Sequence, residues 1–221
     1  MVVPDGGAGM DGAGEAMDAP TEEAAAVMDA PSEETAAITD APTEEAGPTG
    51  PFTEFDIPTA NSSPWGIAVG PDGALWFTEL VGGKIGRITV AGAITEHPIP
   101  TAMSSPFGIA AGPDGNLWFT EESADKIGRI TPSGTFTEFV VPSAGANLEG
   151  IAAGLDLNLW FAEADTNKIG RIATTGTITE FPVATPVSYP SYIASGPDGA
   201  LWFTEAFGKI GRIIRDRPRY M

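Results

Sequence analysis

Leu75-Trp76-Phe77-Thr78-Glu79 is the stretch from which the fold follows, because the chain contains it four times. It returns at 117–121, at 159–163 with alanine in place of threonine, and at 201–205, each time 42 residues after the previous copy. In most copies Gly-Ile-Ala and Pro-Asp-Gly precede it, and Lys-Ile-Gly-Arg-Ile follows. A fixed period of this length is the signature of a repeat architecture.

A full repeat has the pattern of four short strands, expected in the first repeat at 66–70, 74–79, 84–89 and 93–99. Pro71-Asp72-Gly73, between the first two of these, has turn chemistry. Leu75 and Phe77 point to one face of the sheet and Trp76 to the other, so both faces are apolar. Such a sheet is stable in water only when other sheets cover both faces. Four antiparallel strands in about 42 residues describe one blade of a β-propeller.

The sequence therefore predicts an all-β fold, a β-propeller of four 42-residue blades. The ends of the array are complementary, because 52–57 is a spare strand and the last repeat stops at its third strand, 209–213. We expect 52–57 to run beside 209–213, so that this N-terminal strand completes the last blade and closes the ring. The alternative is an open arc, whose apolar end faces would aggregate or form a homo-oligomer.

Two local features of the repeats carry further expectations. In the simplest register Glu79 lies opposite Lys84 and Trp76 opposite Arg87, which predicts an ion pair and a guanidinium–ring contact. The third repeat has Leu-Asp-Leu at 155–157 where the others have Pro-Asp-Gly. A branched residue then takes a turn position that suits glycine, so we expect the third blade to be the least regular.

Charge divides the chain into three predicted segments. Residues 1–50 contain 12 acidic residues, no basic ones and an 11-residue repeat, which predicts a disordered acidic tail. Residues 51–214 form the predicted propeller, and 215–221 a frayed C-terminal tail. The net charge of −19 argues against nucleic acid and membrane surfaces as partners. Neither a signal peptide nor a membrane span is visible, so the expected location is the cytoplasm by default.

The repeat motifs resemble those of the streptogramin (virginiamycin B) lyase family. The resemblance covers 52–213 and is carried by Thr53-Glu54-Phe55, Pro64-Trp65-Gly66-Ile67-Ala68, the segment from Gly70 to Glu79, and Lys84-Ile85-Gly86-Arg87-Ile88. It implies a seven-bladed propeller that opens a cyclic depsipeptide antibiotic by elimination, an antibiotic-resistance activity. In that reaction a histidine takes the α-proton beside the ester while Mg²⁺ polarises the ester.

The histidines of the family precede Gly-Ile or Ala-Ile at the mouth of the central channel. The corresponding positions here are Trp65, Phe107, Glu149 and Ser191. A glutamate is expected two residues earlier, where this chain has Ser63, Ser105, Asn147 and Tyr189. The only histidine, His97, falls on a predicted outermost strand, where a structural role is expected.

We therefore expect a binding or scaffold module with no catalytic residue. Its ligand, a small cyclic peptide or another axial ligand, would lie at a mouth formed by Trp65, Phe107, Glu149 and Ser191. Glu149 is the only axial candidate for a metal. The alternative is an active, Mg²⁺-dependent streptogramin B lyase, assembled from more than one chain. A third class, a propeller resembling sugar-acid lactonases, would need several carboxylates at the axis.

Overall fold

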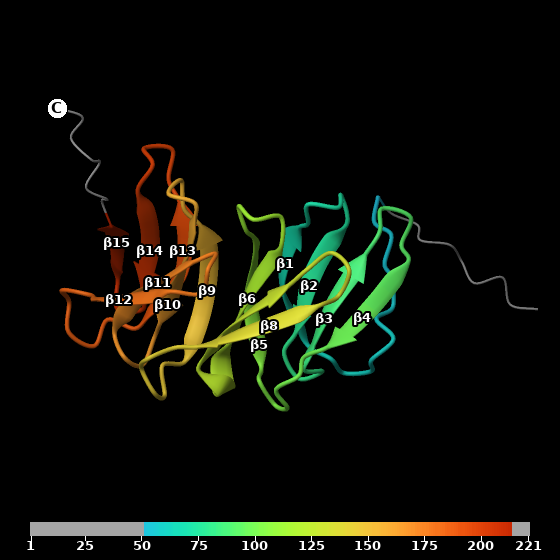
Figure 1. The fold of residues 1–221 in the computed structure, drawn as a ribbon, viewed down its shortest axis with the longest axis horizontal. Coiled ribbons are helices and arrows are strands. Elements are labelled where there is room, and N and C mark those ends of the chain that lie inside the picture. The colour runs from blue at the N-terminus through green and yellow to red at the C-terminus, as the bar shows by residue number, and fades with distance from the viewer. Residues whose placement is uncertain (1–50, 214–221) are drawn as a thin grey trace, which may run out of the picture. The chain divides into compact units, whose positions relative to one another are not determined.

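The repeats fold into antiparallel sheets that follow one another along the chain (Figure 1). The computed structural model describes residues 51–213, so the predicted tails at 1–50 and 215–221 lie outside the described residues. Three sheets have four strands in sequential order and one has three. The strands are β1 (Pro64–Val69), β2 (Leu75–Glu79), β3 (Lys84–Ile88) and β4 (Ile94–Pro98); β5 (Pro106–Ala111), β6 (Leu117–Glu121), β7 (Lys126–Ile130) and β8 (Phe136–Val140); β9 (Leu148–Ala153), β10 (Asn158–Glu163), β11 (Lys168–Ala173) and β12 (Ile178–Pro182); and β13 (Pro190–Ser195), β14 (Leu201–Glu205) and β15 (Lys209–Ile213). The predicted all-β, propeller-like architecture is confirmed.

The turn before the second strand of each sheet is fixed by one aspartate. Asp72 accepts hydrogen bonds from the backbone N–H of Ala74 at 3.3 Å and from the indole Nε1 of Trp76 at 3.0 Å. The same aspartate-to-indole bond recurs at Asp114 and Trp118, at 3.0 Å. The bond sets the orientation of the tryptophan before any neighbouring sheet is considered, so the Asp-x-x-x-Trp spacing is itself a local structural motif.

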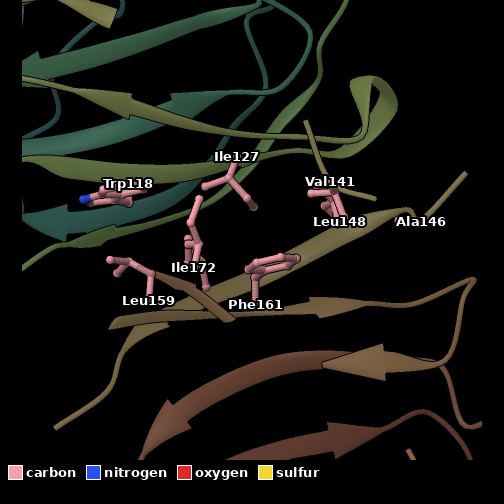
Figure 2. Close-up of a cluster of buried hydrophobic side chains, with 9 residues drawn as sticks. Trp118, Ile127, Val141, Ala146, Leu148, Leu159, Phe161 and Ile172 are labelled. Atoms are coloured by element: carbon pink, nitrogen blue, oxygen red, sulfur yellow. The ribbon is translucent and has the colours of Figure 1, made fainter. Parts of the chain in front are cut away.

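The sheets stack face to face, and the tryptophan face of one packs on the leucine–phenylalanine face of the next. Figure 2 shows the central cluster, in which Trp118 and Ile127 from the second sheet meet Leu159 and Phe161 from the third. Equivalent clusters join the first sheet to the second and the third to the fourth. Trp76 and Trp118 are fully buried, as the two-faced apolar pattern predicts, whereas Trp202, at the end of the series, is 38% exposed.

The predicted pairing of 52–57 with β15 is wrong in this structure. Residues 52–57 form no strand, and β15 pairs only with β14, so the fourth sheet has three strands. Instead, Phe55 packs over Gly92 of the first sheet, and Thr59 donates its backbone N–H to Glu96 at 2.9 Å. The segment thus gains its packing from the sheet that directly follows it in sequence, and closure of a four-sheet ring is not seen.

The predicted register is correct, but the predicted ion pair is not formed. Trp76 lies opposite Arg87, whose guanidinium carbon is 5.9 Å from the ring centroid, and Glu79 lies opposite Lys84. However, Lys84 forms its ion pair with Glu96 on β4, at 2.8 Å, while Glu79 is fully buried. The Glu79 side chain instead lies against Gly82 in the loop that follows β2. In the next two sheets the lysine of the third strand likewise pairs with the glutamate of the fourth strand, as Lys126–Glu138 and Lys168–Glu180.

The third sheet keeps a regular strand pairing, contrary to expectation, and its turn accommodates Leu157 at a φ of 64°. Gly73, Gly115 and Gly199 take the equivalent position, with φ between 75° and 78°. The irregularity is therefore confined to one backbone angle, which costs a residue with a Cβ about 1–2 kcal/mol.

We expect Leu157→Gly to raise the free energy of unfolding by about 1 kcal/mol, because relief of this strain exceeds the extra entropy of an unfolded glycine. Leu157 is an exposed side chain, so little packing is lost. Urea denaturation measures the change, and Gly115→Leu is the matched control, expected to be destabilising by a similar amount. A loss of stability in Leu157→Gly would contradict the argument.

In the described part of the chain, no helix has the length and apolar character needed to cross a membrane.

Candidate functional site

The four positions singled out in the sequence lie at equivalent irregularities of the innermost strands. The pairing of β1 with β2 slips between Pro64 and Ile67, and the same slip occurs in β5, β9 and β13. Trp65, Phe107, Glu149 and Ser191 each lie inside one of these bulges. A bulge re-aims the side chain that it contains, and bulges are common beside binding sites.

The innermost strands are neighbours in the order β1, β5, β9 and β13. Two of the four predicted side chains meet there, since the rings of Trp65 and Phe107 are 5.0 Å apart between centroids. Beyond Phe107 lies Tyr192 of β13, with centroids 6.2 Å apart, although β5 and β13 belong to sheets two places apart. Curvature of the series thus brings side chains from three sheets around one groove.

This aromatic groove encloses about 500 Å³. Its floor is formed by glycine and isoleucine residues of the four innermost strands, and its sides by the three aromatic rings; the lining is Pro64, Trp65, Gly66, Ile67, Phe107, Gly108, Ile109, Gly150, Ile151, Tyr192 and Ile193. Trp65 is 54% exposed and Tyr192 55% exposed. Large, exposed and rigid aromatic side chains around an apolar floor are typical of a surface that binds a ligand.

Glu149 and Ser191 lie together but are not among the residues that line the groove. The hydroxyl of Ser191 donates a hydrogen bond to Oε2 of Glu149, between adjacent innermost strands. Glu122 is also close to Glu149: burial raises the pKa of Glu122, and the negative charges of Glu149 and Asp165 raise it further. The structure therefore divides the predicted mouth into an aromatic pair and a hydrogen-bonded polar pair.

Tyr192 was not identified as a site residue from the sequence, although the repeat contains a signal. It replaces the glycine found at 66, 108 and 150. A Cβ on those glycines would lie 2.7, 2.7 and 2.8 Å from a backbone oxygen of the next innermost strand. Glycine is thus required wherever another described sheet follows. No described sheet follows β13, so a tyrosine fits there and its ring reaches the groove.

His97 lies on β4, as predicted, and not among the groove-lining residues. Its ring stacks on Trp76 with centroids 5.6 Å apart, in the place that Phe139 and Phe181 take against Trp118 and Trp160. Burial lowers the pKa of His97, and the positive charge of Arg87 lowers it further. An imidazole stacked on a buried tryptophan at this position fits the expected structural role.

The Mg²⁺ ion that the family resemblance implies does not fit the innermost strands. Mg²⁺ requires near-octahedral oxygen ligands, usually one or two carboxylates completed by water or substrate. Glu149 is the one carboxylate at the four predicted positions, and the other three offer neither a carboxylate nor an imidazole. Among residues 51–213, no group of three or more His, Cys, Asp or Glu side chains could hold a metal ion.

The stacked antiparallel sheets and the shared inner groove define the chain as a repeat protein of the β-propeller class. The model of the virginiamycin B lyase family matches residues 43–218, so the chain belongs to that family. The solved virginiamycin B lyase of Staphylococcus aureus is 48% identical, with a TM-score of 0.73 over 74% of this chain and 56% of that one. A solved streptogramin B lyase is 43% identical, with a TM-score of 0.70 over 72% of this chain and 53% of that one.

A curated relative, the virginiamycin B lyase of Bacillus licheniformis, is 50% identical over 40 residues, which is 18% of this chain and 14% of that protein. The chain thus spans a little over half the length of the solved lyases and a smaller part of the curated one. A gluconolactonase of Xanthomonas campestris is similar in fold alone, at 18% identity and a TM-score of 0.55 over 67% of this chain and 56% of that one.

Proposed function

We propose that this chain is a binding module of the virginiamycin B lyase family, which holds a small cyclic peptide lactone in the aromatic groove without opening its ring. The observation that carries the proposal is the set of three rings, Trp65, Phe107 and Tyr192, around an apolar floor of about 500 Å³. Flat aromatic faces suit a cyclic peptide with aromatic and apolar side chains, since stacked pairs contribute beyond their buried area.

The choice of ligand class is supported by one solved relative. A catalytically inactive variant of the Staphylococcus aureus virginiamycin B lyase, 47% identical to this chain, was solved with quinupristin. Quinupristin is therefore the probe of choice for the aromatic groove. The proposal that the ring stays closed rests on the residues at the four bulges, which offer one carboxylate and no imidazole as a base.

The competing function is that of an active lyase, and the identity of 43–48% to solved lyases favours it. A working reaction needs a base positioned at the substrate's α-proton. Among the bulge residues of one chain only Glu149 could act as this base, and a carboxylate is a weaker base than an imidazole. A lyase would therefore need groups from outside the described residues.

Quinupristin binding followed by calorimetry separates the two functions when product is measured in parallel by mass spectrometry, with Mg²⁺ and with EDTA. We expect saturable binding and an intact ring under both conditions. We expect Trp65→Ala to weaken binding roughly tenfold or more, because loss of a central aromatic contact costs about 1.4 kcal/mol or more. Trp202→Ala is the control, because Trp202 is also an exposed tryptophan, at 38% against 54% for Trp65, but does not line the groove.

Linear product that disappears with EDTA would establish the lyase function instead. Equal affinities in the wild type and in Trp65→Ala would show that the aromatic groove is not the binding site.

A further inference from the structure

The fourth sheet has an open edge at β15 in the described part of the chain. In each of the other three sheets the third strand pairs with a fourth, and its lysine forms an ion pair with a glutamate there, as in Lys84–Glu96. The equivalent lysine, Lys209, bonds to the hydroxyl of Thr185 at 3.0 Å and has no ion pair among the described residues. Ile210 beside it is 64% exposed.

Residues 52–57 carry the sequence of the missing strand. Glu54 lies 42 residues before Glu96, which itself precedes Glu138 and Glu180 at the same period. Glu54 is exposed and has no ion pair among the described residues, although its counterparts all pair with a lysine. One unpaired lysine and one unpaired glutamate thus occupy matching positions of the repeat.

The segment 52–57 is also already in the position of a fourth strand relative to the sheet that follows it. Phe55 packs over Gly92 as His97 packs over Gly134 and as Phe139 packs over Gly176. Thr59 donates its backbone N–H to Glu96 as Thr101 does to Glu138. The segment therefore occupies the place of the outer strand of a preceding sheet, whose other strands are absent from the described chain.

We propose that a second copy of this chain supplies the missing partner, with its residues 52–57 pairing along β15. In this pairing β15 takes the place of β3, and residues 52–57 of the second copy take the place of β4. The register of β3 with β4 then puts Lys209 opposite Asp56, Gly211 opposite Glu54 and Ile213 opposite Phe52 of the second copy. Lys209 then reaches Glu54 of the second copy as Lys84 reaches Glu96. The contact needs no rearrangement, because 52–57 keeps its packing on its own first sheet.

The apolar end faces of the series match in the same way. Trp202 is 38% exposed at one end and Leu75 is 37% exposed at the other, although their equivalents Trp118 and Leu117 are fully buried. In the described cores the tryptophan of one sheet packs against the leucine of the next. The joint between copies would bury these two faces against each other, which is the main favourable contribution to association.

Tyr192 sets the geometry of this joint. The close approach of neighbouring innermost strands requires glycine, and Tyr192 stands in its place on β13. The second copy must therefore lie further away at the innermost strands than a sheet of the same chain does. Two copies joined head to tail at two such contacts form a ring of eight sheets, within the range of four to eight known for propellers.

Cysteine cross-linking tests the strand pairing, and the chain has no cysteine of its own. Asp56→Cys and Lys209→Cys are both on exposed residues, and directly opposite residues of antiparallel strands are about 4.5–5.5 Å apart, within disulfide range. We expect the double variant, oxidised at 0.15 M salt, to give a covalent dimer of twice 22.8 kDa. Thr53→Cys with Lys209→Cys is the control, displaced by three residues or about 10 Å, and is expected to stay uncross-linked.

A disulfide within one chain would overturn the proposal and indicate a four-sheet ring. The absence of any cross-link would also overturn the proposal. A ladder of larger species would overturn the two-copy ring. Sedimentation of the unmodified protein provides a second measurement, for which we expect a dimer that dissociates at least tenfold more readily in Glu54→Lys. Lys209→Glu added to Glu54→Lys should restore the dimer, whereas a wild type that stays monomeric would overturn the proposal. None of these outcomes depends on ligand binding.

Discussion

Replacement of Trp118 by alanine is expected to lower the free energy of unfolding by about 3–5 kcal/mol, the usual loss for a large aromatic residue in a core. Trp118 is fully buried between the second and third sheets. Its ring stacks on Phe139 at 5.5 Å and lies 5.4 Å from the guanidinium carbon of Arg129, and its Nε1 donates to Asp114. All of these contacts disappear together, and a cavity remains.

Trp202→Ala is the matched control for this prediction. Trp202 has the same place in the repeat and the same aspartate bond, at 3.2 Å, but it is 38% exposed. At a protein concentration low enough to keep the chain monomeric, we expect its loss to cost about 1 kcal/mol, because no described sheet packs on this face of the fourth sheet. Urea denaturation measures the free energy of unfolding of both variants. An unchanged m-value shows that the substitution altered stability and not the surface exposed on unfolding. Equal losses at the two positions would contradict the stacking of the sheets.

The second large effect is expected from pH, through Glu121. This glutamate is fully buried, and neither of its carboxylate oxygens has a hydrogen-bond partner among the described residues. Burial and, to a smaller extent, the charge of Glu138 raise the pKa of Glu121 from an ordinary value of 4.5 to about 8, with Lys126 offsetting part of the rise. Between these two values the folded state binds more protons than the unfolded state.

The free energy of unfolding should therefore fall as pH rises from about 4.5 to about 8, and the penalty is complete above that range. At about 1.4 kcal/mol for each unit of pKa, the upper bound for this one group is roughly 4–5 kcal/mol. We expect Glu121→Gln to be more stable than the wild type by about 2–4 kcal/mol at pH 9, because the buried charge is gone, and nearly equal to it at pH 4.

Chemical denaturation across this pH range measures the effect. Other carboxyl groups act in the opposite direction at lower pH. Hydrogen bonds to Thr101 and Lys126 hold the pKa of Glu138 below its usual range despite its partial burial. The stabilisation that Glu138 contributes is present above the pKa of this group in the unfolded state. It is lost as pH falls through the lower pKa of the folded state. A stability gap for Glu121→Gln that does not grow with pH would contradict the assignment.

The repeat pattern places the four candidate positions at one backbone location, whereas the orientation of their side chains could not be read from it; that they bind a ligand stays a prediction. All four positions fall in the same bulge of an innermost strand, because they share one place in the repeat. Which of them face the groove depends on curvature between sheets, and it is Trp65 and Phe107 that do so. The ring of Tyr192 also lines the groove, because no described sheet packs beyond β13 and leaves too little room for a side chain at that position. This depends on the place of the repeat in the series and not on the sequence of the repeat.

What the sequence by itself determined is the local and periodic part of the structure: the four-stranded unit, its turns, the register that places Trp76 opposite Arg87, and the burial of both sheet faces. These follow from residue spacing within about 42 positions, because strand alternation and turn chemistry are local. Only the tertiary structure decided where 52–57 lies and which carboxylate Lys84 binds. Both are choices between chemically equivalent partners on different strands or sheets, and such choices depend on which partner lies within reach in space.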